Sequence, residues 1–160
     1  MIDPRSKIAP SAFVGTARSI GAHTTIWHFV LVGDGASIGS NCTIGSHVEI
    51  GRNVVIGDRC KIQAGAFIPE GVVIGDDVFI GPRVVFTNVK RPQASVSVPN
   101  HLYVGTTVLN GVSIGANSTI VCGVTLHSGC MVGAGSVVTK DVKPAALVYG
   151  NPAEEDWKKL

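Results

Sequence analysis

Residues 38–80 read IGSNCTIGSHVEIGRNVVIGDRCKIQAGAFIPEGVVIGDDVFI, and isoleucine stands at every sixth position from Ile38 to Ile80. Going back in steps of six, every position is aliphatic as far as Ile8, and one step forward gives Phe86. Four places after each of these residues the side chain is usually small or β-branched. A short and regular period is typical of a repeat architecture, so the fold has to be derived from the repeat.

Each six-residue repeat predicts one short strand followed by one corner. Side chains alternate along a strand, so Ile44 and the small residue two places before it, Cys42, face the same side. Glycine and polar residues between such pairs suit a tight turn. Three repeats complete an 18-residue triangular coil, and about seven coils are expected. We therefore predict an all-β fold, a hexapeptide-repeat parallel β-helix over residues 1–152, whose left hand is inferred from known proteins with this repeat.

The repeat is interrupted once. Between Phe86 and Leu102 the step is 16 residues instead of six, and the stretch between them contains Pro92 and Pro99. We expect residues 87–101 to leave the coil as an inserted loop, and the repeat to resume at Leu102 and to continue to Val138.

The C-terminal end is expected to leave the coil pattern. Pro144 stops the repeat, and residues 153–160 are then a C-terminal tail. Within this tail, Glu154–Leu160 could form a short helix whose Trp157 covers the open end of the β-helix, because that end otherwise exposes strand edges. A frayed tail is the equally supported alternative.

The composition limits the class of protein. Of 160 residues, 13 are Lys or Arg, 11 are Asp or Glu, 15% are charged and 45% are hydrophobic. This balance argues against disorder and against a dedicated nucleic-acid binder. No apolar run approaches the roughly 18 to 20 residues that cross a bilayer. Met1–Pro4 does not resemble the start of a secretory signal. We expect a soluble, cytoplasmic protein without membrane insertion and without a nucleic-acid partner.

Outward-facing residues form columns, because equivalent positions of adjacent coils stack on one another. One column is largely apolar and consists of Phe13, Leu31, Glu49, Phe67 and Val85, with Gly15, Gly33 and Gly51 beside it to allow close backbone approach. The matching column on another face consists of Lys7, Thr25, Thr43, Lys61 and Phe79. A contiguous exposed apolar stripe usually marks an interface. We therefore expect an oligomer, a homotrimer by analogy with the fold, with the inserted loop near a subunit boundary and a site shared between chains.

The four cysteines lack the spacing of a zinc site or of a disulfide framework. Cys42, Cys60 and Cys130 fall at inward positions and are expected to be core residues, whereas Cys122 falls at a turn. No metal is expected. Of the five histidines, His28 lies at a corner, where it is either solvated or available as a substrate contact or general base.

Several stretches carry a more specific signal than the repeat. They are Ile26–Val30 (IWHFV), Val54–Gln63 (VVIGDRCKIQ), Phe79–Pro82 (FIGP), Phe86–Val89 (FTNV) and Ile114–Gly123 (IGANSTIVCG). With them, roughly residues 8–152 resemble the bacterial nucleotide-sugar 3-amino N-acetyltransferases, which acetylate UDP-linked 3-amino-glucuronate or dTDP-linked 3-amino-3,6-dideoxyhexoses. The chain departs from the common pattern of that family at Ala64 and Gly65, among other positions.

The resemblance implies a function and a set of residues. It implies an acetyl-CoA-dependent N-acetyltransferase that acts on a nucleotide-linked amino sugar for surface polysaccharide, with acetyl-CoA as co-substrate. Asn88 and His28 are then the candidate catalytic residues. The candidate acetyl-CoA contacts are Gly115, Cys122, Gly123, Ala134 and Lys140, and the candidate sugar-nucleotide contacts are Trp27, Gln63 and Arg91. A backbone N–H at a corner is expected to stabilise the oxyanion of the transition state.

Three other functions stay open at this point. The first is an acyltransferase for another small acceptor. The second is a non-catalytic β-helical scaffold. The third and least supported is a γ-type carbonic anhydrase, which holds zinc with three histidines; here His23 and His28 have one of the required spacings, but no upstream chain supplies the third.

Overall fold

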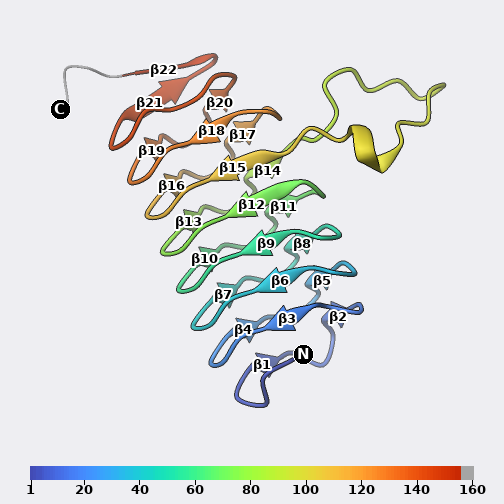
Figure 1. The fold of residues 1–160 in the computed structure, drawn as a ribbon. Helices are drawn as coiled ribbons and strands as arrows, with labels where there is room; N and C mark the ends of the chain where they lie inside the picture. The colour runs from blue at the N-terminus through green and yellow to red at the C-terminus, as the bar shows by residue number, and fades with distance from the viewer. Residues whose placement is uncertain (156–160) are drawn as a thin grey trace.

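The strands of this protein are hydrogen-bonded to strands one full coil away. Phe67 pairs with Glu49 in the coil before it and with Val85 in the coil after it. The computed structural model describes residues 1–155. Over these residues the strands stack into a three-sided prism, from the N-terminus at one end to β21 and β22 at the other (Figure 1). The predicted all-β parallel β-helix is confirmed.

Each side of the prism is one parallel sheet. The first face contains β1 (Lys7–Ile8), β4 (Thr25–Ile26), β7 (Thr43–Ile44), β10 (Lys61–Ile62), β13 (Phe79–Ile80), β16 (Ser113–Ile114), β19 (Met131–Val132) and β21 (Leu147–Gly150). The second face contains β2 (Phe13–Val14), β5 (Leu31–Val32), β8 (Glu49–Ile50), β11 (Phe67–Ile68), β14 (Val85–Phe86), β17 (Thr119–Ile120) and β20 (Val137–Val138). The third face contains β3 (Ser19–Ile20), β6 (Ser37–Ile38), β9 (Val55–Ile56), β12 (Val72–Ile74), β15 (Thr106–Val108) and β18 (Thr125–Leu126).

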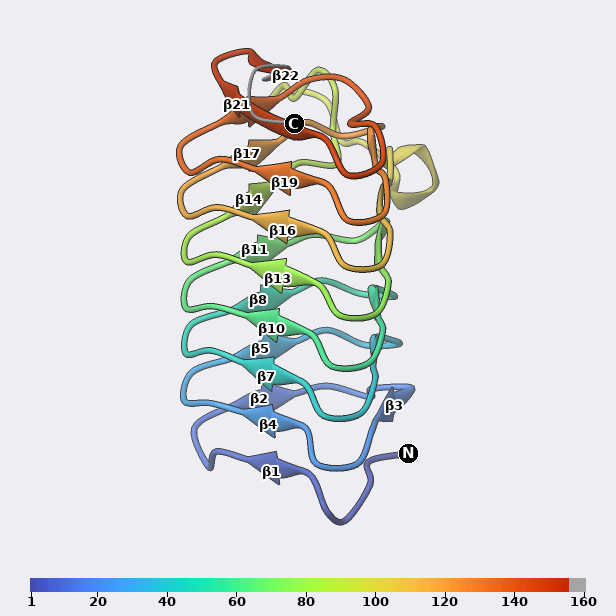
Figure 2. The same ribbon diagram turned by 90° about the vertical axis from the view of Figure 1, so that its left-hand side faces the viewer.

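The coil is left-handed, as predicted. In Figure 2 the chain rises from the N-terminus, crosses the front of the prism along the first face, turns at the left edge to the second face behind, and returns through the third face on the right. We call the edge between the first and second faces the first corner, that between the second and third faces the second corner, and that between the third and first faces the third corner.

The inside of the prism is filled by the repeat aliphatics. Ile44, Ile50 and Ile62 have no exposed surface, and Phe86 fills the same kind of position. Each buried side chain of this size contributes roughly 1.5 to 3 kcal/mol to folding relative to an exposed one. The stacked isoleucines therefore supply most of the driving force for a fold whose strands are mainly two residues long.

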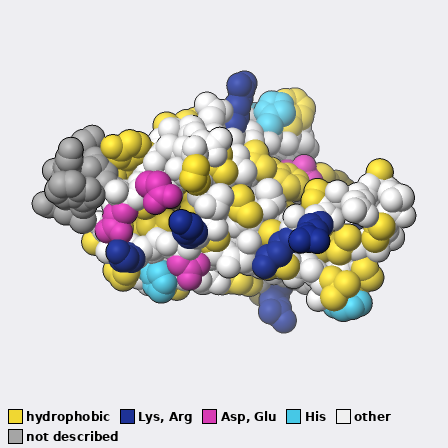
Figure 3. Space-filling model, turned by 90° about the horizontal axis from the view of Figure 1, so that it is seen from above, with side chains coloured by type: hydrophobic (Ala, Val, Ile, Leu, Met, Phe, Trp, Pro, Cys, Tyr) yellow, Lys and Arg dark blue, Asp and Glu magenta, His cyan; other side chains and the backbone are white. Residues whose placement is uncertain are grey.

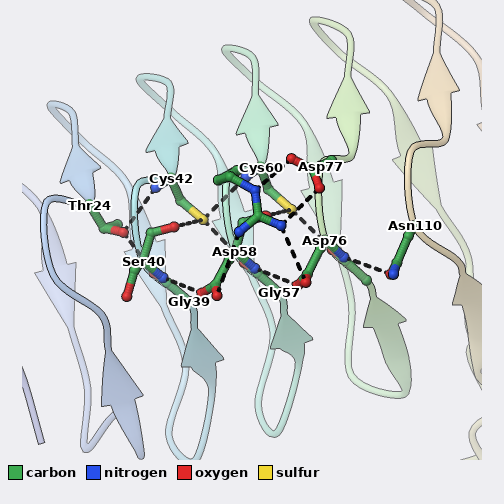
Figure 4. Close-up of polar contacts among 12 residues, drawn as sticks. Thr24, Gly39, Ser40, Cys42, Gly57, Asp58, Cys60, Asp76, Asp77 and Asn110 are labelled. Atoms are coloured by element: carbon green, nitrogen blue, oxygen red, sulfur yellow. Dashed lines mark hydrogen bonds and ion pairs between the residues drawn. The ribbon is translucent and has the colours of Figure 1, made fainter.

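A hydrogen-bonded column runs inside the third corner (Figure 4). The Sγ of Cys42 donates to the carbonyl of Gly57 at 3.1 Å, and the Sγ of Cys60 donates to that of Gly75 at 3.1 Å. The hydrogen bond to Cys42, together with burial, raises the pKa of the Cys60 thiol. The four cysteines are buried and free, so the inward placement of Cys42, Cys60 and Cys130 and the turn position of Cys122 are confirmed.

Close approach of neighbouring coils explains the glycines beside the apolar column. A Cβ on Gly33 would lie 2.7 Å from the amide nitrogen of Arg52, and one on Gly51 would lie 2.5 Å from that of Glu70. Because such distances are below van der Waals contact, only glycine fits. The close approach predicted here is thus made between coils of the same chain.

The predicted end of the inserted loop is wrong. Leu102 does not resume the repeat, because it lies in a short 3-10 helix, η1 (Asn100–Leu102), and is 57% exposed. The coil resumes at β15, where Thr106 to Val108 pair with Val72 to Ile74. The six-residue spacing of Leu102 from Val108 suggested that the coil resumes at Leu102. The backbone rejoins the coil at the second corner, where Gly105 packs closely on Gly71. The loop protrudes from that corner in Figure 1.

The coil also continues beyond its predicted end. Val142 bridges to Leu126, and Val148 pairs with Val132, so the pattern does not stop at Pro144. Pro144 lies in a turn, where its fixed φ is compatible with the coil. Beyond it, β22 (Ala153–Glu155) pairs antiparallel with β21.

The predicted C-terminal helix over Glu154–Leu160 is wrong for the two of its residues that the structure describes. Glu154 and Glu155 belong to a strand, because their backbone pairs with the edge of β21. Trp157 lies outside the described residues. Among residues 1–155 there is no helix with the length and apolar character that crossing a bilayer requires.

The third-corner column predicts how its cysteines can be replaced. Val78 and Val112 occupy the equivalent inward position in later coils and are fully buried, so valine fits there. We expect the double variant Cys42→Val, Cys60→Val to fold with a loss of about 1 kcal/mol in the free energy of unfolding. Denaturant melts measure this loss. A variant that cannot fold would show that the column is stabilised by the thiol hydrogen bonds and not by the volume of the side chains.

Candidate functional site

The predicted site residues lie mainly along the two corners that border the second face. Trp27, His28, Gln63, Gly115 and Ala134 lie at or beside the first corner, whereas Asn88, Cys122, Gly123 and Lys140 lie at or beside the second, and Arg91 is exposed on the inserted loop. His28 and Asn88 are therefore on different corners, three coils apart, which is roughly 14 Å along the prism. One chain does not bring the two candidate catalytic residues together.

The first corner carries a cluster of rings near the N-terminal end. Nδ1 of His28 lies 2.8 Å from the hydroxyl of Ser11, which also accepts a hydrogen bond from the backbone N–H of Phe29. The ring of Phe29 is 5.1 Å from that of His47 in the next coil. Trp27 is half exposed beside a hollow that it lines together with His28. His28 is thus oriented by Ser11, and the corner offers aromatic faces to a ligand.

His23 and His28 diverge. The strand β4 separates them, so His23 is on the third corner and His28 is on the first. Within residues 1–155, no three His, Cys, Asp or Glu side chains are grouped so that they could hold a metal ion.

The second corner fixes the amide of Asn88. Its Nδ2 donates to the backbone carbonyl of Glu70 at 3.1 Å, and its own backbone carbonyl accepts the N–H of Val104 at 2.8 Å. Because only the amide nitrogen can donate to a carbonyl, the contact with Glu70 decides which way the side chain is turned. The Oδ1 takes part in none of the hydrogen bonds found among residues 1–155, so it is the atom that Asn88 can offer to a ligand.

Glu70 ties this corner together and was missed by sequence reasoning. Its Oε1 accepts a hydrogen bond from Asn53 at 3.1 Å, and its Oε2 accepts one from Asn100 at 3.2 Å. Asn100 belongs to η1, so the carboxylate links the inserted loop to the coil. The sequence could have indicated the contact between Glu70 and Asn88, because Glu70 stands one full coil before Asn88 in the same column.

The backbone amides of this corner are largely in use. The N–H of Cys122 donates to the hydroxyl of Thr87 at 3.0 Å, and the N–H of Gly123 donates to the carbonyl of Gly105 at 3.0 Å. These two amides are therefore not free to stabilise an oxyanion. The N–H of Ala134 on the first corner takes part in none of the hydrogen bonds found among residues 1–155, and the residue is exposed.

The C-terminal end of the prism carries paired charges. The Nζ of Lys140 lies 3.8 Å from the carboxylate of Glu154, and that of Lys143 lies 2.8 Å from Glu155. Figure 3, seen from this end, shows basic and acidic side chains close together. Lys140 is highly exposed, so its weak pairing leaves it available to an anionic ligand.

The repeat itself identifies the family. The family model "Bacterial transferase hexapeptide (six repeats)" matches residues 19–52, 53–88 and 105–140, and the gap in the match is the inserted loop. The chain belongs to this family. Family membership agrees with the coil geometry and with the resemblance found in the sequence.

Individual relatives are named as acetyltransferases. The chain is 60% identical over 48 residues to dTDP-3-amino-3,6-dideoxy-alpha-D-galactopyranose 3-N-acetyltransferase of Aneurinibacillus thermoaerophilus, which covers 30% of this chain and 25% of that protein. It is 39% identical over 70 residues to a chloramphenicol acetyltransferase of Agrobacterium fabrum, covering 43% of this chain and 34% of that protein. The matched segments therefore span only a quarter to a third of these curated relatives.

Solved structures share the fold over almost the whole chain. A mutant of GDP-perosamine N-acetyltransferase from Caulobacter crescentus, in complex with CoA and GDP-perosamine, has a TM-score of 0.59 at 21% identity, covering 97% of this chain and 55% of that one. A mutant of AntD, an N-acyltransferase from Bacillus cereus in complex with dTDP and coenzyme A, has a TM-score of 0.61 at 21% identity, with coverages of 97% and 78%. At these identities the likeness establishes the common fold.

The Glu70 contacts predict the order of the inserted loop. In Glu70→Ala the carboxylate links to Asn53 and Asn100 are lost, while the carbonyl that holds Asn88 remains. We expect hydrogen exchange of the Tyr103 and Val104 amides to quicken roughly tenfold or more, because local opening becomes easier. In Glu70→Gln, which keeps one acceptor oxygen, the exchange rates of these amides should lie between those of the wild type and of Glu70→Ala. Unchanged exchange in Glu70→Ala would show that the loop is held by other contacts.

Proposed function

We propose that this protein transfers the acetyl group of acetyl-CoA to the amino group of a nucleotide-linked amino sugar, in the biosynthesis of surface polysaccharide. Membership of the hexapeptide transferase family and the 60% identity to a dTDP-amino-sugar N-acetyltransferase support this function. The observation that carries it is the orientation of the Asn88 side chain. Its Nδ2 donates to the Glu70 carbonyl, whereas its Oδ1 takes part in none of the hydrogen bonds found within residues 1–155. Both co-substrates are cytoplasmic metabolites, so we place the reaction in the cytoplasm.

Asn88 supplies what an amine acceptor needs. Its Oδ1 accepts one N–H of the sugar amine and so directs the nitrogen lone pair at the thioester carbonyl. The C–N bond forms, the C–S bond breaks, and the proton lost by the nitrogen leaves with the CoA thiolate as the free thiol. An amide acceptor suffices for orientation, because a neutral amine needs no strong base to attack a thioester. The Glu70 carbonyl keeps the Asn88 amide from rotating.

Both corners and the inserted loop contribute the remaining predicted contacts. We propose that Trp27, His28 and Gln63 contact the sugar nucleotide, and that Arg91 reaches it from the loop. We also propose that Gly115, Cys122, Gly123, Ala134 and Lys140 line the acetyl-CoA site. Two observations support the acetyl-CoA site. The N–H of Ala134 donates to no acceptor within residues 1–155, and the ammonium of Lys140 is exposed, so both can donate to an anionic oxygen.

Assembly completes the site in this proposal. Because Asn88 and His28 lie on opposite edges of the second face, a second copy packed on that face can place its first corner beside the second corner of its neighbour. The apolar column of that face supports such packing, since Phe13, Leu31 and Phe67 are 66%, 42% and 36% exposed. We propose a homotrimer with sites between subunits.

A different small acceptor is the alternative that an observation favours. The 39% identity to a chloramphenicol acetyltransferase covers more of this chain than the match to the sugar enzyme. Assays with acetyl-CoA against a panel of nucleotide amino sugars and of small alcohols and amines separate the two. Turnover of a nucleotide amino sugar supports the proposal, and turnover confined to other acceptors overturns it.

Asn88→Ala tests the catalytic role. We expect turnover to fall roughly 10- to 100-fold with CoA affinity unchanged, because the variant loses an orienting hydrogen bond but little packing. Gln93→Ala, an exposed change in the same loop, is the control and should keep full turnover. Steady-state kinetics and CoA titration provide the two readouts. Normal turnover in a folded Asn88→Ala protein would remove Asn88 from the mechanism.

Phe67→Asp tests the assembly. A charge at this position would be buried without a partner if the second face is an interface, so we expect the trimer to dissociate at micromolar concentration. Phe79→Asp is a matched control, because Phe79 occupies the same outward position on the first face and is 39% exposed. Light scattering gives the mass of both variants. A trimer that persists in Phe67→Asp, or dissociates equally in both, would contradict the assignment.

A further inference from the structure

Two arginines occupy the same kind of corner position but have opposite surroundings. Arg59 on the third corner and Arg83 on the first both have left-handed backbone conformations, with φ of 57° and 56°. Nε of Arg59 lies 2.7 Å from Asp77, and the same guanidinium lies 3.4 Å from Asp76. This carboxylate row stands along the third corner in Figure 4. Arg83 has no ion-pair partner anywhere in residues 1–155.

The coil before Arg83 leaves a gap on the first corner. Phe29, His47, Gly65 and Arg83 occupy one column of this corner in successive coils, and all have a positive φ. Gly65 has φ of +72°, and a Cβ there would meet only the Cγ of Arg83, at 3.4 Å. The gap forms a hollow lined by Ser46, His47, Ala64, Gly65 and Arg83. We call it the first-corner notch.

We propose that the first-corner notch binds the diphosphate group of a nucleotide ligand. An unpaired guanidinium forms strong, charge-assisted hydrogen bonds with phosphate oxygens, and often forms two at once. The imidazole of His47 and the hydroxyl of Ser46 add donors on the other side of the gap. The backbones at His47 and Arg83 are two coils apart, roughly 10 Å. A diphosphate between them can form a hydrogen bond at each end.

The surroundings of the notch favour a nucleoside diphosphate over inorganic anions. The ring of Phe29 lies next to that of His47 and is 60% exposed, and Trp27 is nearby on the same corner. Exposed aromatic rings one coil from a phosphate site can stack on a nucleobase. The proposal deepens the proposed function, on which it rests for the source of the diphosphate. Coenzyme A also contains a diphosphate, so the test must separate the two ligands.

Binding measurements test the notch without any need for turnover. Calorimetry with UDP, dTDP and inorganic pyrophosphate, and separately with CoA, is carried out on the wild-type protein and on three notch variants. Arg83→Ala removes the guanidinium. Gly65→Asp places a carboxylate in the gap, and Gly65→Asn fills it with a neutral group of the same size; both residue types tolerate a positive φ better than most. Two controls on other corners are Arg18→Ala, an exposed arginine, and Gly129→Asp, a glycine with φ of +69° and nothing within 4 Å of a Cβ.

We expect Arg83→Ala to weaken UDP or dTDP binding roughly tenfold or more, and Gly65→Asp to weaken it further than Gly65→Asn, with CoA binding unchanged in all three. The two controls should bind like the wild type. Equal nucleotide affinity in wild type, Arg83→Ala and Gly65→Asp would overturn the proposal, as would a matched loss of CoA binding or no nucleotide binding by the wild type. If the wild type and Arg83→Ala both turn over a nucleotide amino sugar with the same KM for that sugar, the assignment of the notch as the diphosphate site is overturned. The proposed function is then left intact. A wild-type protein that turns over no nucleotide amino sugar, yet binds nucleotide in a way that depends on Arg83, would overturn the proposed function and leave the notch intact.

Discussion

The hydrogen-bonded register of one full coil is the constraint on which this structure depends. Strands of two residues cannot persist alone, and each is stable only because the coils before and after it supply its partners. The same register keeps the isoleucines stacked inside and places any outward residue beneath its counterpart in the next coil. Extra residues must then leave the prism entirely, and the segment between β14 and β15 does so at one corner without disturbing the pairing above and below it.

The register also explains how the candidate site is built. Asn53, Glu70 and Asn88 come from three successive coils, yet they meet because they lie along the same corner. Glu70 acts at two places, with its carbonyl on Asn88 and its carboxylate on the loop. A function placed on a solenoid of this kind is assembled along the axis, and each coil adds one side chain per corner. Its geometry depends on the regularity of the coils rather than on local loop packing.

The sequence predicts the parts of this structure that follow from periodicity. The isoleucine column, the inward cysteines and the apolar column from Phe13 to Val85 were all found by counting. Leu102 shows where counting fails, since a leucine at the expected spacing cannot show whether the backbone has returned to its corner. The Glu70 to Asn100 hydrogen bond was out of reach, because it joins the coil to a loop that has no period. The separation of His28 from Asn88 follows from the corner geometry once the coil is known.

The two ends of the prism differ in how their strands are paired. At the first coil, Ile2, β1 and β2 all pair in parallel with the coil that follows, whereas at the other end β22 folds back antiparallel on the last strand of the first face. A further coil would need the edge of β21 for a parallel strand, and β22 already uses the hydrogen-bonding groups of that edge. In a fold whose every layer can receive another, β22 occupies the place that a further parallel strand of the first face would take. It keeps the edge of β21 from pairing in parallel with a strand of another chain.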